Sequence, residues 1–183
     1  LSAEAVRRVF TIKRRPFHNP VLVLLSGIDD MGKLVRSVPD YVEPLLKLWP
    51  GGITFIFESG DALPAALTGG TGKIGVRLPA HPVAKAVIEH FGGPITGTSA
   101  NLSGRPAPDT AQGVLAQLES RIDLILDGGT CPGGIASTIV DLTVTPPAAT
   151  TYGSSAPPKY LIGGCAVHAG VLYAVISYDP SAS

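Results

Sequence analysis

Residues 74–104 read IGVRLPAHPVAKAVIEHFGGPITGTSANLSG, and the expected fold depends on the pattern in this stretch. Its apolar start, Ile74–Leu78, is typical of a buried strand. Pro82–His90 has a proline at the first helical position and ends before Gly92–Gly93, which indicates a helix. A second short strand, Ile95–Ser99, leads directly into a loop of small hydroxyl residues. Strand, helix and strand in this order predict an α/β unit.

The same alternation continues on both sides of this stretch. Short apolar runs predict further strands at Val21–Leu25, Ile53–Phe57, Leu124–Leu126 and Thr138–Leu142. Helices are expected at Ser2–Ile12, Met31–Val38, Tyr41–Leu48 and Asp109–Leu118, with Ser2 and Asp109 as caps. Several strands are apolar throughout, as in a sheet that is covered on both faces. We therefore expect an α/β fold in which helices flank a sheet.

The composition changes after Leu142. Residues 143–159 are rich in Pro, Thr, Ser and Ala, which is typical of a linker or an extended surface segment. Val171–Tyr178 is apolar enough for one more strand. We predict a domain over residues 1–145, followed over residues 146–183 by a linker and a C-terminal tail with one possible strand.

The overall composition limits the classes of function. The chain has 183 residues, 45% of them apolar and 15% charged, which suits one packed domain. Its formal net charge of zero leaves only local clusters to bind polyanions. The two cysteines and four histidines lack metal-ligand spacing, so no metal site of the protein itself is predicted. We expect a reduced, cytoplasmic setting without a membrane helix or a secretory signal.

The first candidate cluster is Lys13-Arg14-Arg15-Pro16. A residue before proline is displaced toward extended backbone, where alternate side chains point to the same side. Lys13 and Arg15 are then expected to aim two positive charges at one place, which suits a triphosphate. A solvated basic helix end is the alternative.

The second candidate is the loop Thr98–Gly104, which contains Ser99 and Asn101. Small hydroxyl residues and glycine allow backbone N–H groups to approach a phosphate or a nucleoside. The loop follows the carboxyl end of a strand, where open α/β sheets bind ligands. An ordinary polar turn is the alternative.

Two further positions are candidates for contact with a small substrate. Arg77 ends an apolar strand and is placed to bind a carboxylate through two parallel hydrogen bonds, although pairing with an acid at the core edge is equally compatible. Ser137 precedes a strand and follows glycine-rich residues. Asp141 is interpreted as a capping acid.

Together and in this order, these stretches resemble the YrdC family. The matching sequences are AVRRVFTIKRRPFHNPVLVLL, LWPGGITFIF, IGVRLPAHPVAKAVIEHFGGPITGTSANLSGRPAP and IDLILDGGTCPGGIASTIVDLT, within about residues 3–147. The resemblance implies a YrdC-like open twisted α/β sheet, flanked by helices, around a deep positive cavity.

The resemblance also implies a threonylcarbamoyl-AMP synthase. Such an enzyme condenses L-threonine, bicarbonate and ATP to threonylcarbamoyl-AMP and pyrophosphate, for the modification of adenosine in tRNA. The implied ATP-binding positions are Lys13, Arg15, Asn19, Ser99 and Asn101, and the implied threonine-binding positions are Arg77 and Ser137.

This chemistry requires no catalytic side chain, because the carbamate of threonine attacks the α-phosphate. Catalysis then consists of positioning and charge neutralisation, with Mg²⁺ entering together with ATP. The implied partners are the small substrates and a downstream tRNA-modifying transferase complex, with weak RNA binding as a further option and no membrane contact.

The chain departs from the family pattern at several positions. The family begins with a strand and a PTxTxYGLG-type segment, and this sequence opens downstream of it at Leu1, so we expect the sheet to lack that strand. The stretch AATTYGSS replaces an ILRPG-like sequence, with Thr151 near the arginine position. Leu24 stands where a histidine is common, and Lys73 where a small hydroxyl residue is typical, although a lysine there is still suited to contact with a phosphate.

Two other functions stay open. One is a non-catalytic module that binds nucleotide or RNA, and the other is a YrdC-like carbamoyl-transfer domain that uses carbamoyl phosphate instead of threonine. Pyrophosphate release that depends on threonine separates the synthase from both.

Overall fold

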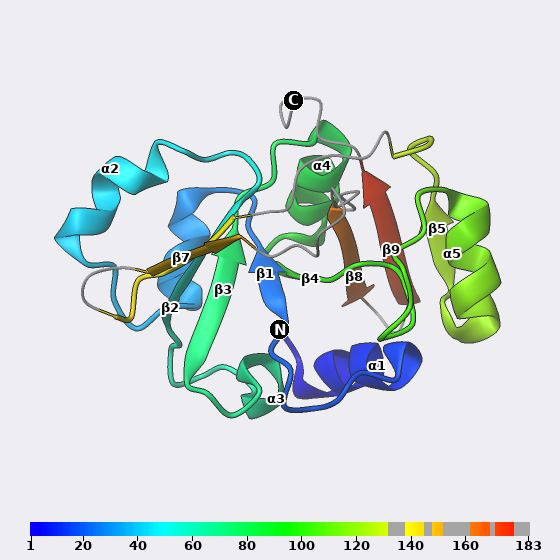
Figure 1. Cartoon of the computed structure of the whole chain (residues 1–183), viewed down its shortest axis with the longest axis horizontal. Helices are drawn as coiled ribbons and strands as arrows, with labels where there is room; N and C mark the ends of the chain where they lie inside the picture. Colours follow the sequence, from blue (N-terminus) through cyan, green and yellow to red (C-terminus); the bar gives the residue numbers. More distant parts are fainter. Residues whose placement is uncertain (132–137, 145–147, 152–161, 169–170, 178–183) are drawn as a thin grey trace.

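The computed structural model describes residues 1–131, 138–144, 148–151, 162–168 and 171–177 of the chain (Figure 1). Within these ranges nine strands form one open, mixed sheet, in the order β5-β9-β8-β4-β1-β3-β2-β6-β7. The strands are β1 Leu22–Leu24, β2 Ile53–Glu58, β3 Lys73–Arg77, β4 Ile95–Gly97, β5 Leu124–Leu126, β6 Thr138–Asp141, β7 Ala148–Thr151, β8 Ile162–His168 and β9 Val171–Ser177.

Helices flank this sheet, as expected. The α-helices are α1 Ala3–Lys13, α2 Glu43–Leu46, α3 Ala65–Thr68, α4 Pro82–Phe91 and α5 Ala111–Leu118, and the 3-10 helices are η1 Ile28–Lys33, η2 Asp40–Val42 and η3 Glu119–Arg121. The predicted architecture, an open sheet flanked by helices, is confirmed. Every helix in the described part of the chain is too short or too polar to cross a membrane.

The longer helices begin and end at residues suited to these positions. Ser2 precedes α1 and its side chain caps the helix, as predicted. Gly92 ends α4 in the left-handed region, with φ 73°. Thr110, not Asp109, caps α5, because its hydroxyl accepts a hydrogen bond of 3.1 Å from the Gly113 N–H.

Side-chain alternation gives the central strands two different faces. On the first face lie Phe55, Phe57, Ile74 and Val76, all at most 2% exposed, which pack in one cluster with side chains of α1. On the second face, Leu24 and Ile95 pack against Ile88 of α4. This contact lies over β1 and β4, so α4 covers only part of the second face.

The chain between β1 and β2 differs from the two predicted helices, Met31–Val38 and Tyr41–Leu48, which are wrong in type or length. It forms the two 3-10 helices η1 and η2 and one short α-helix, α2. Asp30 explains the tight turn at η1, because its carboxylate accepts hydrogen bonds from the Ser26 N–H at 3.1 Å, the Ser26 hydroxyl at 2.7 Å and the Lys33 ammonium at 2.8 Å. After η1, Val35 forms an isolated antiparallel bridge with Ser59, so the chain leaves the helical region.

Three strands of the sheet come from residues 148–177. β7 pairs with β6, and the antiparallel pair β8–β9 lies between β4 and β5. β9 falls within the stretch expected to form a strand, whereas β7 and β8 were not expected, since AATT and IGGCAVH have few large β-forming residues. The division of the chain at residues 145 and 146 stays a prediction.

Replacing Phe55 with Ala is expected to lower the free energy of unfolding by about 3–5 kcal/mol. The ring is fully buried, and its centroid lies 5.0 Å from that of Trp49 and 6.5 Å from that of Phe57. Urea denaturation followed by circular dichroism measures the change. Phe17→Ala is the control, because Phe17 is 57% exposed and its loss should cost less than about 1 kcal/mol. Equal losses for the two variants would contradict this assignment of the core.

Candidate functional site

A cavity of about 570 Å³ opens on the second face of the sheet, over the adjacent strands β4, β1, β3, β2 and β6. Its lining consists of Arg15, Asn19, Pro20, Val21, Leu22, Thr54, Ile56, Thr71, Lys73, Gly75, Gly97, Thr98, Ser99 and Ile139. Among these described lining residues two are cationic, Arg15 and Lys73, and none is acidic. The lining therefore favours an anionic ligand.

Two residues of the cavity floor, Gly75 and Gly97, have no side chain, which adds to the depth of the cavity. A Cβ atom at Gly97 would lie 2.5 Å from Leu22 Cδ1 and 2.9 Å from Leu24 Cγ, so a side chain does not fit without displacing both. A Cβ atom at Gly75 would lie 3.2 Å from Thr54 Cγ2 and would extend into the cavity. Both residues follow the alternation that directs their neighbours to this face, and their lack of side chains leaves the hollow.

The strand register defines two ends of the cavity. Gly97 pairs with Leu22, and Gly75 pairs with Ile56, so these residues mark its middle. Lys73 precedes Gly75 by two residues and Ser99 follows Gly97 by two, and because β3 and β4 run in opposite directions both lie toward the same end. Arg77 lies two residues beyond Gly75, at the opposite end.

Arg15 lines the first end of the cavity, together with Asn19 and Ser99. Its Nε atom donates to the Asn19 carbonyl at 3.2 Å and its Nη2 atom to the Pro20 carbonyl at 2.7 Å. These bonds to the following turn hold the guanidinium at the rim. The predicted grouping of Arg15, Asn19 and Ser99 is therefore present in space, and their role as ATP ligands stays a prediction.

Lys13 lies elsewhere than the sequence pattern suggested. It is the last residue of α1 and Arg14 is left-handed, with φ 50°, so Lys13 and Arg15 are not alternate residues of an extended segment. The Lys13 side chain is 2% exposed and is absent from the cavity lining. Its ammonium donates to the carbonyls of Ser99 and Asn101, the latter at 2.6 Å, and to Asn101 Oδ1 at 3.3 Å. Lys13 thus fixes the loop that presents Ser99.

Asn101 stabilises the same loop from within. Its Nδ2 atom donates to the carbonyls of Leu102 at 2.9 Å and Arg105 at 2.6 Å, and its Oδ1 atom accepts a hydrogen bond from the Ser99 hydroxyl. The side chain is 8% exposed and does not line the cavity. Of the two loop residues predicted to bind ATP, Ser99 therefore faces the hollow and Asn101 supports it.

Arg77 lies at the end of the cavity opposite to Arg15, where Thr54 stands between it and the cavity. Arg77 is 5% exposed and is absent from the cavity lining. Its guanidinium donates to Thr54 Oγ1 through Nε at 2.9 Å and Nη2 at 2.6 Å. Thr54 does line the cavity and was not predicted, although the alternation in ITFIF opposes it to the buried Phe55. Ser137, the second predicted threonine-binding residue, lies outside the described residues.

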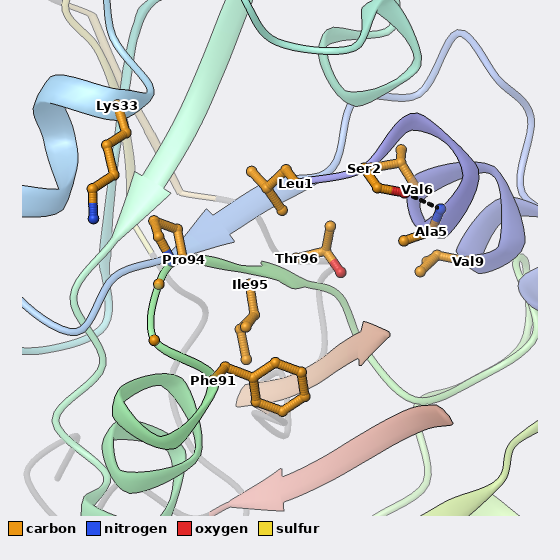
Figure 2. A pocket seen from close by; sticks show the side chains of 12 residues that line it. Leu1, Ser2, Ala5, Val6, Val9, Lys33, Phe91, Pro94, Ile95 and Thr96 are labelled. Carbon is orange, nitrogen blue, oxygen red and sulfur yellow. Dashed lines mark hydrogen bonds between the residues drawn. The ribbon is translucent and has the colours of Figure 1, made fainter. Parts of the chain in front are cut away.

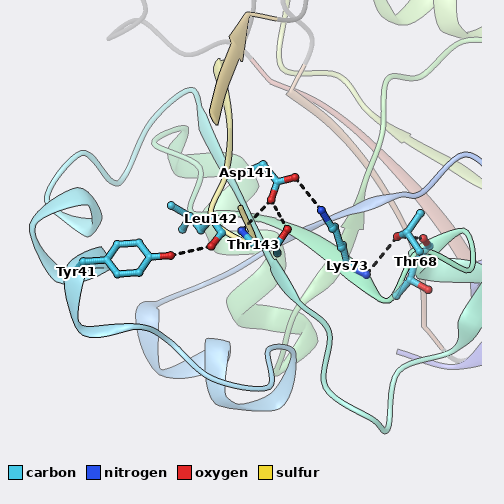
Figure 3. A network of polar contacts seen from close by, with 7 residues as sticks. Tyr41, Thr68, Lys73, Asp141, Leu142 and Thr143 are labelled. Carbon is cyan, nitrogen blue, oxygen red and sulfur yellow. Dashed lines mark hydrogen bonds and ion pairs between the residues drawn. The ribbon is translucent and has the colours of Figure 1, made fainter. Parts of the chain in front are cut away.

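The sequence marks Lys73 as a departure from the family pattern that is still suited to a phosphate, and in the structure it lines the cavity. Figure 3 shows its contact with Asp141. Its ammonium lies 3.0 Å from Asp141 Oδ2, across the intervening strand β2. The other carboxylate oxygen of Asp141 accepts hydrogen bonds from the Thr143 N–H at 2.9 Å and the Thr143 hydroxyl at 2.6 Å. Burial raises the pKa of Asp141, but the hydrogen bonds from Thr143 and Lys73 outweigh this effect and hold the pKa below its ordinary value of 3.8.

A second cavity, of about 450 Å³, lies between the start of α1 and the segment from Phe91 to Thr96 (Figure 2). Apart from Ser2, Lys33 and Thr96, its lining residues have apolar side chains or none, and Lys33 is paired with Asp30 at 2.8 Å. In the described ranges no three His, Cys, Asp or Glu residues come close enough to hold a metal ion.

Replacing Lys13 with Met is expected to destabilise the fold by about 2–5 kcal/mol, because buried acceptors of Ser99 and Asn101 lose their donor. Chemical denaturation measures the loss. Lys47→Met is the control, since Lys47 is exposed. Equal stability of the two variants would contradict the anchoring role of Lys13.

Replacing Asp141 with Asn is expected to lower the melting temperature at neutral pH. Since the pKa of Asp141 is depressed in the folded state, its charged form adds stability above pH 3.8, and this contribution is lost as the pH falls below that value. The difference between the variant and the original chain should therefore shrink on acidification. Asp61→Asn is the control, since the Asp61 side chain is 85% exposed. A difference for Asp141→Asn that does not change with pH would refute the depressed pKa.

The comparisons with known proteins cover the same part of the chain as the cavity. The sequence profile of the Sua5/YciO/YrdC family, described as telomere recombination, matches residues 1–150. A threonylcarbamoyl-AMP synthase of Pyrococcus abyssi is 37% identical over 148 residues, which are 80% of this chain and 44% of the relative. One of Xanthomonas campestris is 36% identical over 136 residues, which are 73% of this chain and 72% of the relative.

A solved structure gives the same result. The crystal structure of P. abyssi Sua5 complexed with L-threonine matches with a TM-score of 0.75 and 36% identity, over 79% of this chain and 43% of that one. The chain therefore spans less than half the length of the Pyrococcus protein. Every described residue that lines the first cavity lies within residues 1–150. The family profile matches most of the chain, and the chain covers 72% of the Xanthomonas relative at 36% identity. The chain therefore belongs to the Sua5/YciO/YrdC family.

Proposed function

We propose that this chain forms threonylcarbamoyl-AMP and pyrophosphate from L-threonine, bicarbonate and ATP. The observation that carries the proposal is the first cavity, which has two cations and no acid in its described lining and an arginine–threonine pair at its far end. The relatives named threonylcarbamoyl-AMP synthase support the choice of reaction.

The triphosphate of ATP binds at the end formed by Arg15, Asn19 and Ser99. Arg15 supplies a positive charge and a planar donor set suited to phosphate oxygens, and the Ser99 hydroxyl supplies a neutral donor. Lys13 and Asn101 contribute by holding the loop, through their contacts with Ser99. Mg²⁺ enters as part of the substrate, coordinated by phosphate oxygens and water, since the described lining has no carboxylate.

Threonine binds toward the opposite end. The Arg77 guanidinium is directed by Thr54, and a substrate carboxylate that approaches Thr54 comes within reach of its charge. Ser137 supplies a second contact in this proposal, as the family resemblance implies. The relative solved with L-threonine supports an amino-acid site in this fold.

The reaction then follows from positioning. The amino nitrogen of threonine bonds to the carbon of bicarbonate and water leaves, which gives a carbamate. A carbamate oxygen then attacks the α-phosphorus of ATP. The new P–O bond forms as the bond between the α-phosphorus and the bridging oxygen breaks, and the electron pair leaves with pyrophosphate. Arg15 neutralises charge that grows on the leaving group, which is the contribution expected of a fixed cation.

The product is an activated acyl adenylate and needs an acceptor. We propose a tRNA-modifying transferase complex as the next partner, in the cytoplasm, where ATP and threonine are both present. Contact with RNA is expected to be weak, because the formal net charge of the chain is zero.

Replacing Arg15 with Ala is expected to lower kcat/KM for pyrophosphate release by about 100–1000-fold, because the transition state loses a preorganised cation. Release is measured with ATP, bicarbonate and L-threonine, and threonylcarbamoyl-AMP is identified by mass spectrometry. Arg7→Ala, which removes an exposed arginine of α1, is the control and should keep full activity.

The same assay separates the other functions. Pyrophosphate release that is independent of threonine but requires carbamoyl phosphate would replace the synthase with a carbamoyl-transfer domain. Saturable binding of ATP without any release would replace it with a binding module.

A further inference from the structure

We infer that Lys73 is, after Arg15, a second phosphate-binding cation of the cavity, and that Asp141 holds it in place until the ligand arrives. The inference rests on the proposed function, since it assigns a further ligand to the same triphosphate. It concerns a lysine at a position where the family resemblance leads us to expect a small hydroxyl residue.

The position of Lys73 follows from the strand register. It is the first residue of β3 and shares the second face of the sheet with Gly75 and Arg77. Its end of the cavity is the one that carries Ser99 and Arg15, whereas Arg77 lies at the other end. Lys73 is therefore located beside the proposed phosphate groups and away from the proposed amino-acid site.

The pairing with Asp141 leaves the ammonium able to move. The Lys73 side chain is 39% exposed and the Asp141 side chain 26%, so the ion pair is partly in contact with solvent, where such pairs are weak. A polyphosphate carries several charges and strong acceptors, and it competes effectively with one carboxylate for a flexible ammonium. Asp141 keeps its hydrogen bonds from Thr143 when Lys73 leaves.

A purely structural role makes a different prediction. If the pair only joins β3 to β6 across β2, loss of either partner should lower stability alike and change the affinity for anions alike. If Lys73 binds phosphate, loss of the lysine weakens anion binding, whereas loss of the carboxylate frees the lysine and preserves or strengthens it. Affinity for anions therefore separates the two roles.

The experiment is calorimetric titration of the chain with ATP and, separately, with inorganic tripolyphosphate. Lys73→Met is expected to weaken both by about 10–100-fold, and Asp141→Asn to keep or raise both affinities. Lys73→Arg, which keeps the charge, should recover most of the binding. Lys85→Met is the matched control, because Lys85 is also paired with a carboxylate, that of Glu89 at 3.8 Å, but lies on α4 outside the described lining. It should not change either affinity.

Each other outcome is decisive. Unchanged binding of both anions by Lys73→Met, with binding lost in Arg15→Ala, would overturn the inference and leave the proposed function standing. An equal loss of affinity in Asp141→Asn and Lys73→Met would reduce the pair to a structural link. Weakened binding in Lys73→Met by a chain that never releases pyrophosphate would support the inference and overturn the proposed function. A chain that binds neither probe would overturn both.

Discussion

The buried ammonium of Lys13 is the interaction on which the candidate site depends. It joins the end of α1 to the loop after β4, and the Ser103 N–H adds a bond of 2.8 Å to the Lys13 carbonyl. Two apolar clusters fix the helix that carries it, since Val6 and Phe10 pack in one and Val9 and Ile12 in the other. A buried charge without acceptors is costly, so helix end and loop must adopt their positions together. Ser99 and Arg15 are brought to the same rim as a result.

The cavity itself results from uneven coverage of one sheet face. Over β1 and β4, this face is apolar at Leu24 and Ile95 and is closed by α4. Over β3 and β2 it carries Thr54, Gly75 and Lys73 beside the apolar Ile56, and so offers less apolar surface to a covering helix. The polar part therefore stays open to solvent, and its glycines add depth. The packed part and the open part of this sheet face therefore belong to neighbouring strands.

Much of this arrangement is predictable from the sequence. The rest is not predictable, and the reasons are physical. Short apolar runs give seven of the nine described strands, and caps such as Ser2 and Gly92 give the ends of the long helices. The prediction of a helix over Met31–Val38 is wrong because the Asp30 side chain binds the preceding turn at Ser26. Hydrophobic periodicity carries no information on such side-chain hydrogen bonds. Lys13 contacts the loop of Ser99, but it does not alternate with Arg15 along an extended segment, since Arg14 between them is left-handed. Its expected contact with ATP stays a prediction. Thr54 and Lys73 belong to the site through pairings with distant strands, which no local pattern reveals.

The place of the pair β8–β9 in the sheet has a consequence for biosynthesis. β4 and β5 are made early, at residues 95–97 and 124–126, yet the strands that join them are residues 162–168 and 171–177. On the ribosome, both earlier strands expose unpaired backbone groups until the later residues emerge. Pairing of β8 with β4 and of β9 with β5 joins segments that are far apart in sequence. This step is slow, because the entropy of the connecting chain is lost before the new contacts form. The loop of Ser99 begins directly after β4, so the rim of the cavity borders the last part of the sheet to be completed.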